Sequence, residues 1–366
     1  MKRSWNTRRK FHSESNGDGG TAVMESDRER GSSAAPDPSA RRAQRGARGE
    51  GEPWVVVLAG GEGHRLRAFT TLRDGVVVPK QFCRFRDERT LLATTLDRAL
   101  RITRRDRVIV VVLEAHREWW EPEISRLPER NVLRQPAGRG TAVAILHATV
   151  HIHMRDTTPR IVVMPSDHDV DNEDALVRTL ERGTRLADMY PGDLVLLGIA
   201  PSHLDAEYGL IVPGPGTGII SRPVRAFIEK PTLTVASQLI RGGALWNSFI
   251  FACTGGALYD AFEAALPALA RSYLQGLATG GGNDAALAAL FEELPARDFC
   301  REVLERNASR LRLVTVPECG WTDLGTPARL AAWLDRHREA PFWREHGVPR
   351  LNGTDGLGGT LQAGCA

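Results

Sequence analysis

Three glycines and two cations follow an apolar run near residue 55. The run VVVLA ends in Gly60, Gly61 and Gly63, and Arg65 and Lys80 come soon after. Glycines let backbone N–H groups approach an anion closely, and the two cations can neutralise it. The spacing matches neither GxGxxG nor GxxxxGK[ST], the two common nucleotide fingerprints. The stretch therefore predicts a phosphate-binding loop, and the alternative is an ordinary tight turn with solvated cations.

A second glycine-containing phrase, QPAGRGTA, leads into a helical pattern and contains Gln135, Gly138 and Thr141. The N-terminus of a helix carries free N–H groups and partial positive charge, so it attracts anions. We expect this phrase to contact the same ligand as the first loop. The alternative is an ordinary helix start in which Thr141 is the cap.

Two acidic residues stand at the ends of apolar segments that lie far apart in the chain. Asp167 belongs to the phrase MPSDH, and Asp323 belongs to GWTDLGTP. Two carboxylates brought together from distant strands suit a hard cation such as Mg²⁺ that bridges phosphates. Acidic residues in turns are more often caps or solvated groups, which is the alternative for either residue alone.

The elements that must position these residues alternate between strand and helix patterns. Near-continuous Val/Ile runs separated by helical patterns are typical of strands covered on both faces, which favours a mainly parallel sheet and the α/β class. Ligands gather at the carboxyl ends of such strands, where the phrases above fall. The strands are expected at 54–60, 106–115, 131–136, 160–170 and 193–201, then at 208–214, 224–231 and 246–253, with helices at 90–102, 140–154 and 173–189.

Charge and composition divide the 366 residues into a folded part and two tails. The chain has a net charge of +3, and residues 1–50 alone carry +4, so the remainder is close to neutral. These first residues are rich in Ser, Gly and Arg and show no apolar periodicity. We expect a disordered tail over 1–53, one domain over 54–338 and a loose tail over 339–366. The true start could also be Met24.

Cysteine spacing and hydropathy bound the cellular context. The five cysteines show no CxxC pairs, which argues against structural zinc and for reduced thiols. No apolar run approaches the ~20 residues that span a bilayer, and no signal peptide is visible. We therefore expect a cytoplasmic protein without membrane or nucleic-acid partners, and the sequence leaves homo-oligomerisation open.

The phrases LAGGEGHRL and PKQF together resemble the signature of sugar nucleotidyltransferases, in particular the mannose-1-phosphate guanylyltransferase branch. The resemblance implies a Rossmann-like mixed sheet of the nucleotide-diphospho-sugar transferase type with a smaller sugar-binding subregion. It assigns Arg65 and Lys80 to catalysis on the triphosphate and Asp167 and Asp323 to Mg²⁺. The nucleotide would be held by Gly60, Gly61, Gly63, Gln135, Gly138 and Thr141.

Three further phrases, YGLI, FIEKP and WNSFIF, resemble the sugar-phosphate half of that family's site. By this resemblance Gly209, Glu229, Lys230 and Asn247 would bind the sugar phosphate. The family normally reads WNSG, and this chain carries Phe249 in place of the glycine.

The resemblance predicts transfer of a nucleotidyl group from GTP to mannose 1-phosphate, which gives GDP-mannose and pyrophosphate. Three alternatives remain. The first is the same reaction with glucose 1-phosphate and UTP or dTTP, and the second is a non-catalytic regulatory homologue. The third, a nicotinamide-dependent dehydrogenase, is disfavoured because the chain lacks GxGxxG.

Overall fold

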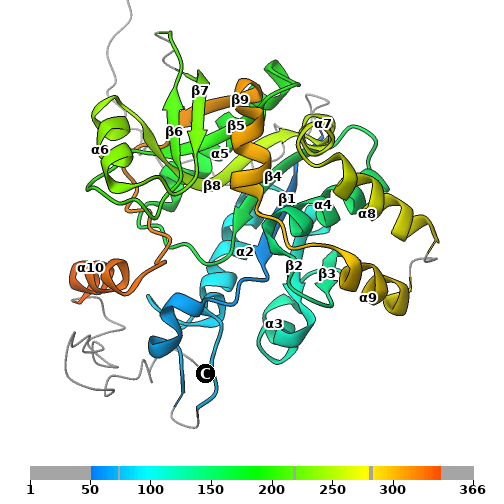
Figure 1. Cartoon of the computed structure of the whole chain (residues 1–366). Helices are drawn as coiled ribbons and strands as arrows, with labels where there is room; N and C mark the ends of the chain where they lie inside the picture. Colours follow the sequence, from blue (N-terminus) through cyan, green and yellow to red (C-terminus); the bar gives the residue numbers. More distant parts are fainter. Residues whose placement is uncertain (1–50, 73–74, 217–219, 280–282, 339–366) are drawn as a thin grey trace, which may run out of the picture. The chain divides into compact units, whose positions relative to one another are not determined.

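The computed structural model describes residues 51–72, 75–216, 220–279 and 283–338 (Figure 1). The tails predicted at 1–53 and 339–366 lie outside this part of the chain, except for residues 51–53. The strands and helices given below all fall within the predicted domain 54–338.

In the described part of the chain, nine strands form one sheet in the order β3-β2-β1-β4-β8-β5-β9-β7-β6 (Figure 1). The first four strands pair in parallel, as their continuous Val/Ile runs predict. Their carboxyl ends therefore meet at one edge of the sheet. These strands are β1 (Trp54–Ala59), β2 (Val108–Leu113), β3 (Val132–Gln135) and β4 (Arg160–Pro165).

The rest of the sheet is mixed. Strand β8 runs antiparallel between β4 and β5, and β9 pairs with β5 in parallel. The hairpin of β6 and β7 completes the sheet with antiparallel pairings. These strands are β5 (Leu194–Ile199), β6 (Leu210–Pro213), β7 (Arg222–Ile228), β8 (Leu245–Thr254) and β9 (Leu311–Thr315).

Helices cover both faces of the sheet, which explains why the central strands are apolar throughout. On β1, Val55 and Val57 face the core that contains α2, α5 and α10, whereas Val56 faces the core of α4 and α7. The helices are α2 (Leu91–Ile102), α3 (Arg117–Ile124), α4 (Gly140–His153), α5 (Glu173–Met189), α6 (Leu233–Arg241), α7 (Gly255–Ala265), α8 (Pro267–Thr279), α9 (Asp284–Glu293) and α10 (Pro327–His337).

Short helical turns shape the loops at the sheet edge. The glycine loop continues into the 3₁₀ turn η2 (His64–Phe69), and Lys80 begins η3 (Lys80–Phe82). A π-helical turn, η7 (Cys300–Leu304), leads into η8 (Glu305–Arg310) before β9. The remaining turns are η4 (Arg105–Arg107), η5 (Glu114–His116) and η6 (Glu129–Asn131).

None of the described helices is both long enough and apolar enough to span a membrane. The four described cysteines are buried and form no disulfide among themselves.

Candidate active site

A pocket of about 420 Å³ lies at the carboxyl ends of the parallel strands and gathers the phrases that the sequence singled out. Gly63 lies beside this pocket, next to Lys80, in a smaller adjoining hollow. The other predicted residues all line the main pocket, namely Gly60, Gly61, Arg65, Lys80, Gln135, Gly138, Thr141, Asp167, Gly209, Glu229, Lys230, Asn247 and Asp323.

The glycine loop keeps its shape through close backbone approaches. Gly63 has a φ of 64°, and a β-carbon there would lie 3.3 Å from the Lys80 backbone nitrogen. The Gln81 side chain holds the loop from below, because its Nε2 donates to the carbonyl oxygens of Ala59 and Gly61 at 2.9 and 2.8 Å. Gln81 was not among the predicted site residues, although it belongs to the PKQF phrase. The loop is therefore shaped before any ligand binds.

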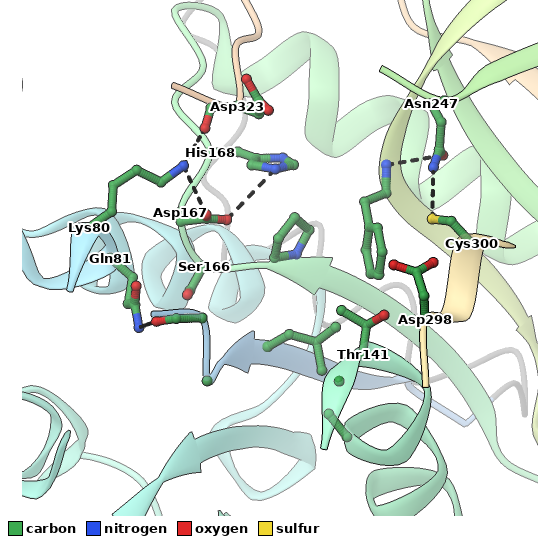
Figure 2. Close-up of a pocket in the computed structure, with 18 of the residues that line it drawn as sticks. Lys80, Gln81, Thr141, Ser166, Asp167, His168, Asn247, Asp298, Cys300 and Asp323 are labelled. Atoms are coloured by element: carbon green, nitrogen blue, oxygen red, sulfur yellow. Dashed lines mark hydrogen bonds and ion pairs between the residues drawn. The ribbon is translucent and has the colours of Figure 1, made fainter. Parts of the chain in front are cut away.

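Lys80 is the buried cation of the site, with a side chain only 6% exposed. Its Nζ lies 2.8 Å from Asp167 Oδ2 and also donates to the backbone carbonyl of Asp323 (Figure 2). Pro79 precedes it in extended conformation and limits the backbone there. A buried ammonium must be paired, so these two acceptors hold Lys80 at the pocket wall.

Asp167 faces the pocket with its side chain 34% exposed. Burial alone would raise the pKa of Asp167, but the Lys80 ammonium outweighs it and the pKa lies below its usual value. The carboxylate is therefore ionised at neutral pH and retains lone pairs toward the pocket. Oxygen ligands of this kind are what Mg²⁺ prefers, so Asp167 fits the expected metal.

His168 is a buried neighbour of that carboxylate. Its Nδ1 accepts a hydrogen bond from the Trp321 indole at 3.2 Å, and its Nε2 lies 3.7 Å from Asp167 Oδ1. Burial lowers the pKa of His168 to about 4, so the ring is neutral with its proton on Nε2. His168 is therefore a neutral neighbour of Asp167, held in place by the Trp321 indole.

Asp323 carries a counter-ion of its own, which the sequence did not predict. Nη1 of Arg329 lies 2.8 Å from both Asp323 oxygens, and Arg329 is only 5% exposed. The Tyr208 hydroxyl and the Gly325 N–H donate to Asp323 Oδ1 at 3.0 and 2.9 Å. Asp323 can therefore bind a metal only if its carboxylate is shared with Arg329. Arg329 lies in the first turn of α10, and no local sequence pattern predicted its role.

The start of α4 forms the second anion-binding wall. Gly140 has a φ of 78°, and no described side chain caps the helix. The interpretation of Thr141 as a cap is wrong, because its Oγ1 accepts from the Phe299 N–H at 2.9 Å instead. One N–H of the first turn, that of Ala142, donates to the Arg297 carbonyl at 3.1 Å, and the uncapped N-terminus of α4 keeps its partial positive charge toward the pocket, which Gly140 and Thr141 line.

Gln135 reaches the pocket from the end of β3 and is 3% exposed. Its Nε2 has no hydrogen-bond partner among the described residues. A buried donor without a partner costs free energy, so this amide is ready to meet an acceptor on a bound ligand.

The opposite side of the pocket is rich in acidic and amide groups. A β-carbon on Gly209 would lie 2.5 Å from Glu229 Oε2, so only glycine leaves room for that carboxyl. Burial, and next the nearby Asp298 carboxylate, raise the pKa of Glu229 to about 7. Asn247 Nδ2 donates to Cys300 Sγ at 3.4 Å (Figure 2).

Some pocket residues were not predicted as site residues. Asp298 precedes η7 and lies beside Thr141, whereas Cys300 begins η7 and lies beside Asn247 (Figure 2). Burial raises the pKa of the Cys300 thiol, which keeps it protonated and a poor nucleophile at neutral pH. Arg139, Glu207, Tyr208, Phe249 and Trp321 also line the pocket, and only Phe249 had been singled out from the sequence.

Comparisons with known proteins show the family of this chain. The model of the nucleotidyl transferase family matches residues 54–337. The xanthan biosynthesis protein XanB of Xanthomonas campestris is 31% identical over 279 residues, which cover 74% of this chain and 57% of XanB. The mannose-1-phosphate guanylyltransferase ManC of Salmonella typhimurium is 30% identical over 287 residues, 75% of this chain and 58% of ManC. The chain thus spans little more than half the length of these relatives.

Solved structures share the fold. A structure described as mannose-1-phosphate geranyltransferase from Thermus thermophilus has a TM-score of 0.65 at 28% identity, over 75% of this chain and 77% of that chain. A UDP-glucose pyrophosphorylase complexed with UDP-glucose has a TM-score of 0.50 at 13% identity and shares the fold alone. The resemblance drawn from the LAGGEGHRL and PKQF phrases is confirmed, and the chain belongs to the nucleotidyl transferase family.

Proposed function

We propose that this chain transfers a nucleotidyl group from a nucleoside triphosphate to a sugar 1-phosphate, with GTP and mannose 1-phosphate as the substrate pair. The observation that carries the proposal is a single pocket with two unlike halves. One half offers the glycine loop, Lys80 and the start of α4, and the other offers Glu229 and Asn247. The first suits a triphosphate and the second suits a polyhydroxylated sugar.

The attacking group in this reaction is a phosphate oxygen of the sugar 1-phosphate, which is already anionic near neutral pH. A bond forms between this oxygen and the α-phosphorus of the nucleotide. The bond between the α-phosphorus and the oxygen that bridges it to the β-phosphorus breaks, and pyrophosphate leaves with the electron pair. No general base is needed, which agrees with a His168 whose unprotonated nitrogen, Nδ1, already accepts a hydrogen bond from the Trp321 indole. Catalysis then consists of alignment and charge neutralisation.

Lys80 and Arg65 would neutralise the phosphates from the glycine-loop side. Arg65 is half-exposed and pairs with Glu207 at 3.1 Å, a surface contact weak enough to exchange for a phosphate. Mg²⁺, held by Asp167 together with Asp323, would supply further neutralisation of phosphate charge. Lys80 would keep Asp167 paired until the substrates enter.

The choice of GTP and mannose 1-phosphate is supported by the names of the relatives and by the PKQF and WNS phrases. The unpartnered Gln135 amide supports a base that offers a carbonyl acceptor, as guanine, uracil, thymine and cytosine do and adenine does not. Glucose 1-phosphate with UTP or dTTP is the second pair to test. Cytoplasmic location, independence from nucleic acid and the oligomeric state stay predictions.

The test is pyrophosphate release from GTP, UTP, ATP, CTP and dTTP, each combined with mannose 1-phosphate or glucose 1-phosphate. Turnover confined to GTP with mannose 1-phosphate supports the proposal in full, and another productive pair keeps the reaction but replaces the substrates. EDTA should abolish release and added Mg²⁺ should restore it. Folded protein that binds a nucleotide but is silent with every pair would instead indicate a regulatory homologue.

A further inference from the structure

Phe249 adopts a backbone conformation that phenylalanine normally avoids. Its φ is 60°, in the left-handed region where a bulky side chain is a genuine outlier. Among the described residues only Lys230, Phe249 and Leu324 combine a side chain with positive φ, and the first two line the pocket. Such strained residues persist where the surrounding structure forces them, and they cluster at functional sites.

An irregularity in β8 forces this conformation. Against β5, Leu196 pairs with Phe251 and Gly198 pairs with Asn247, so β8 carries extra residues between these two positions. Side chains replace the interrupted ladder: Ser248 Oγ donates to the Leu197 carbonyl at 2.6 Å, and the Phe249 N–H donates to Asn247 Oδ1 at 3.1 Å. Bulges of this kind re-aim a side chain, and here they aim Phe249 at the pocket.

The ring of Phe249 belongs partly to the core and partly to the pocket. Its centroid lies 6.3 Å from that of Phe299, which stacks on Phe251 at 5.3 Å. The residue also lines the pocket together with Glu229 and Asn247. An apolar ring therefore stands among the polar groups on the sugar side of the pocket, where the matching phrase of the family has a glycine.

We propose that Phe249 determines which sugar 1-phosphates fit, and this inference rests on the function proposed above. The ring fills space that a glycine would leave open, so the subsite admits a plain hexose 1-phosphate and rejects one with a bulky substituent on the side of the ring. The irregularity in β8 holds Phe249 in its strained backbone conformation. The ring is therefore fixed in place and cannot swing away from a larger substrate. Phe249 acts as a specificity-determining wall and takes no part in the bond changes.

The experiment compares Phe249→Gly and Phe249→Ala, which open the space, with the control Phe249→Leu, which keeps an apolar bulk. Substrates are glucose 1-phosphate, mannose 1-phosphate and glucose 1-phosphates that carry an acetamido group at carbon 2, 3, 4 or 6. The two small variants should raise kcat/KM for at least one acetamido sugar relative to its parent by about ten-fold or more, and Phe249→Leu should keep the wild-type ratio. An unchanged ratio in both small variants overturns the proposal.

A binding readout separates this inference from the proposed reaction. Trp321 lines the pocket, so tryptophan fluorescence can report the Kd of each sugar 1-phosphate without turnover. If the wild type binds these sugars but releases no pyrophosphate, the reaction fails while the Kd ratios still decide the role of Phe249. Phe249→Gly should also melt about 2–4 °C above Phe249→Ala, since only glycine relieves the strain, and equal melting temperatures would contradict the strained wall.

Discussion

At the scale of single residues, the charges of the site are held in pairs before any ligand arrives. Lys80 contacts Asp167 and the Asp323 backbone, and Asp323 contacts Arg329. Buried charges are costly unless paired, so the unliganded site uses its own acids and bases as mutual counter-ions. Phosphates entering the pocket would compete for these cations, which couples binding to a rearrangement of ion pairs.

Replacing Lys80 tests its part in neutralising the transferred phosphate. We expect Lys80→Ala to lower kcat/KM by about 10²–10³-fold, the loss that follows removal of one preorganised electrostatic donor. Arg67→Ala is the control, because Arg67 is an exposed cation in the neighbouring turn η2. Pyrophosphate release measures both variants, with circular dichroism to check folding. A Lys80 variant that turns over at the wild-type rate would remove Lys80 from the mechanism.

Glu229 should make stability depend on pH. Its pKa is raised from 4.5 to about 7, so between these pH values the folded protein holds a proton that the unfolded chain releases. The free energy of unfolding should therefore contain a contribution that falls as pH rises from about 4.5 to about 7. Glu229→Gln should remove it, whereas Glu293→Gln on the exposed side of α9 should not. Urea unfolding across this pH range measures the slopes, and identical slopes in wild type and Glu229→Gln would refute the assignment.

At the scale of elements, the start of α4 joins the two halves of the pocket. The Ala142 N–H donates to the Arg297 carbonyl at 3.1 Å, and the Arg297 N–H donates to the Arg139 carbonyl at 3.0 Å. These bonds fix the phrase QPAGRGT against the segment that presents Asp298. Gly140 makes the approach feasible, because a β-carbon there would lie 2.3 Å from the Arg297 carbonyl oxygen.

Gly140→Ala should therefore damage both stability and nucleotide binding. The positive φ and the backbone clash together predict a loss of at least about 1–2 kcal/mol in the free energy of unfolding, together with a weaker Kd for GTP. Gly256→Ala is the control, since a β-carbon on Gly256 in α7 meets nothing within 4 Å. Thermal unfolding and nucleotide titration give the two values, and a Gly140 variant as stable as the control would contradict this account of α4.

At the scale of the whole described domain, distant parts of the chain close the site. The segment that carries Asp323 returns to the end of β4, where Asp169 and Thr322 exchange backbone hydrogen bonds at 2.9 and 3.0 Å. Helix α10 then packs against the same region, and the Trp333 indole donates to Asp169 Oδ2 at 2.6 Å. The middle and last thirds of the domain thus share one side of the pocket.

Arg329 is a buried cation that joins these segments, because it forms ion pairs with both Asp323 and Asp205 at 2.8 Å. Arg329→Met would leave two carboxylates without their counter-ion, and we expect a loss of about 3–5 kcal/mol in the free energy of unfolding. Arg338→Met, which removes an exposed pair with Asp335, should change it by less than about 1 kcal/mol. Denaturant titration measures the free energy of unfolding of both variants. Equally small losses would show that the buried ion pairs of Arg329 do not stabilise the fold.

Local sequence determined the parts of this protein that depend on local physics. Continuous apolar runs indicated strands covered on both faces, and the glycine and PSDH phrases marked the strand ends that line the pocket. The contacts that complete the site depend on packing between segments that lie far apart in the chain. Only the tertiary structure inserted β8 antiparallel between β4 and β5, paired Arg329 with Asp205, and made Thr141 an acceptor for Phe299 instead of a helix cap. Periodicity and spacing report which face of an element is buried, but they carry no record of which distant residue will meet it there.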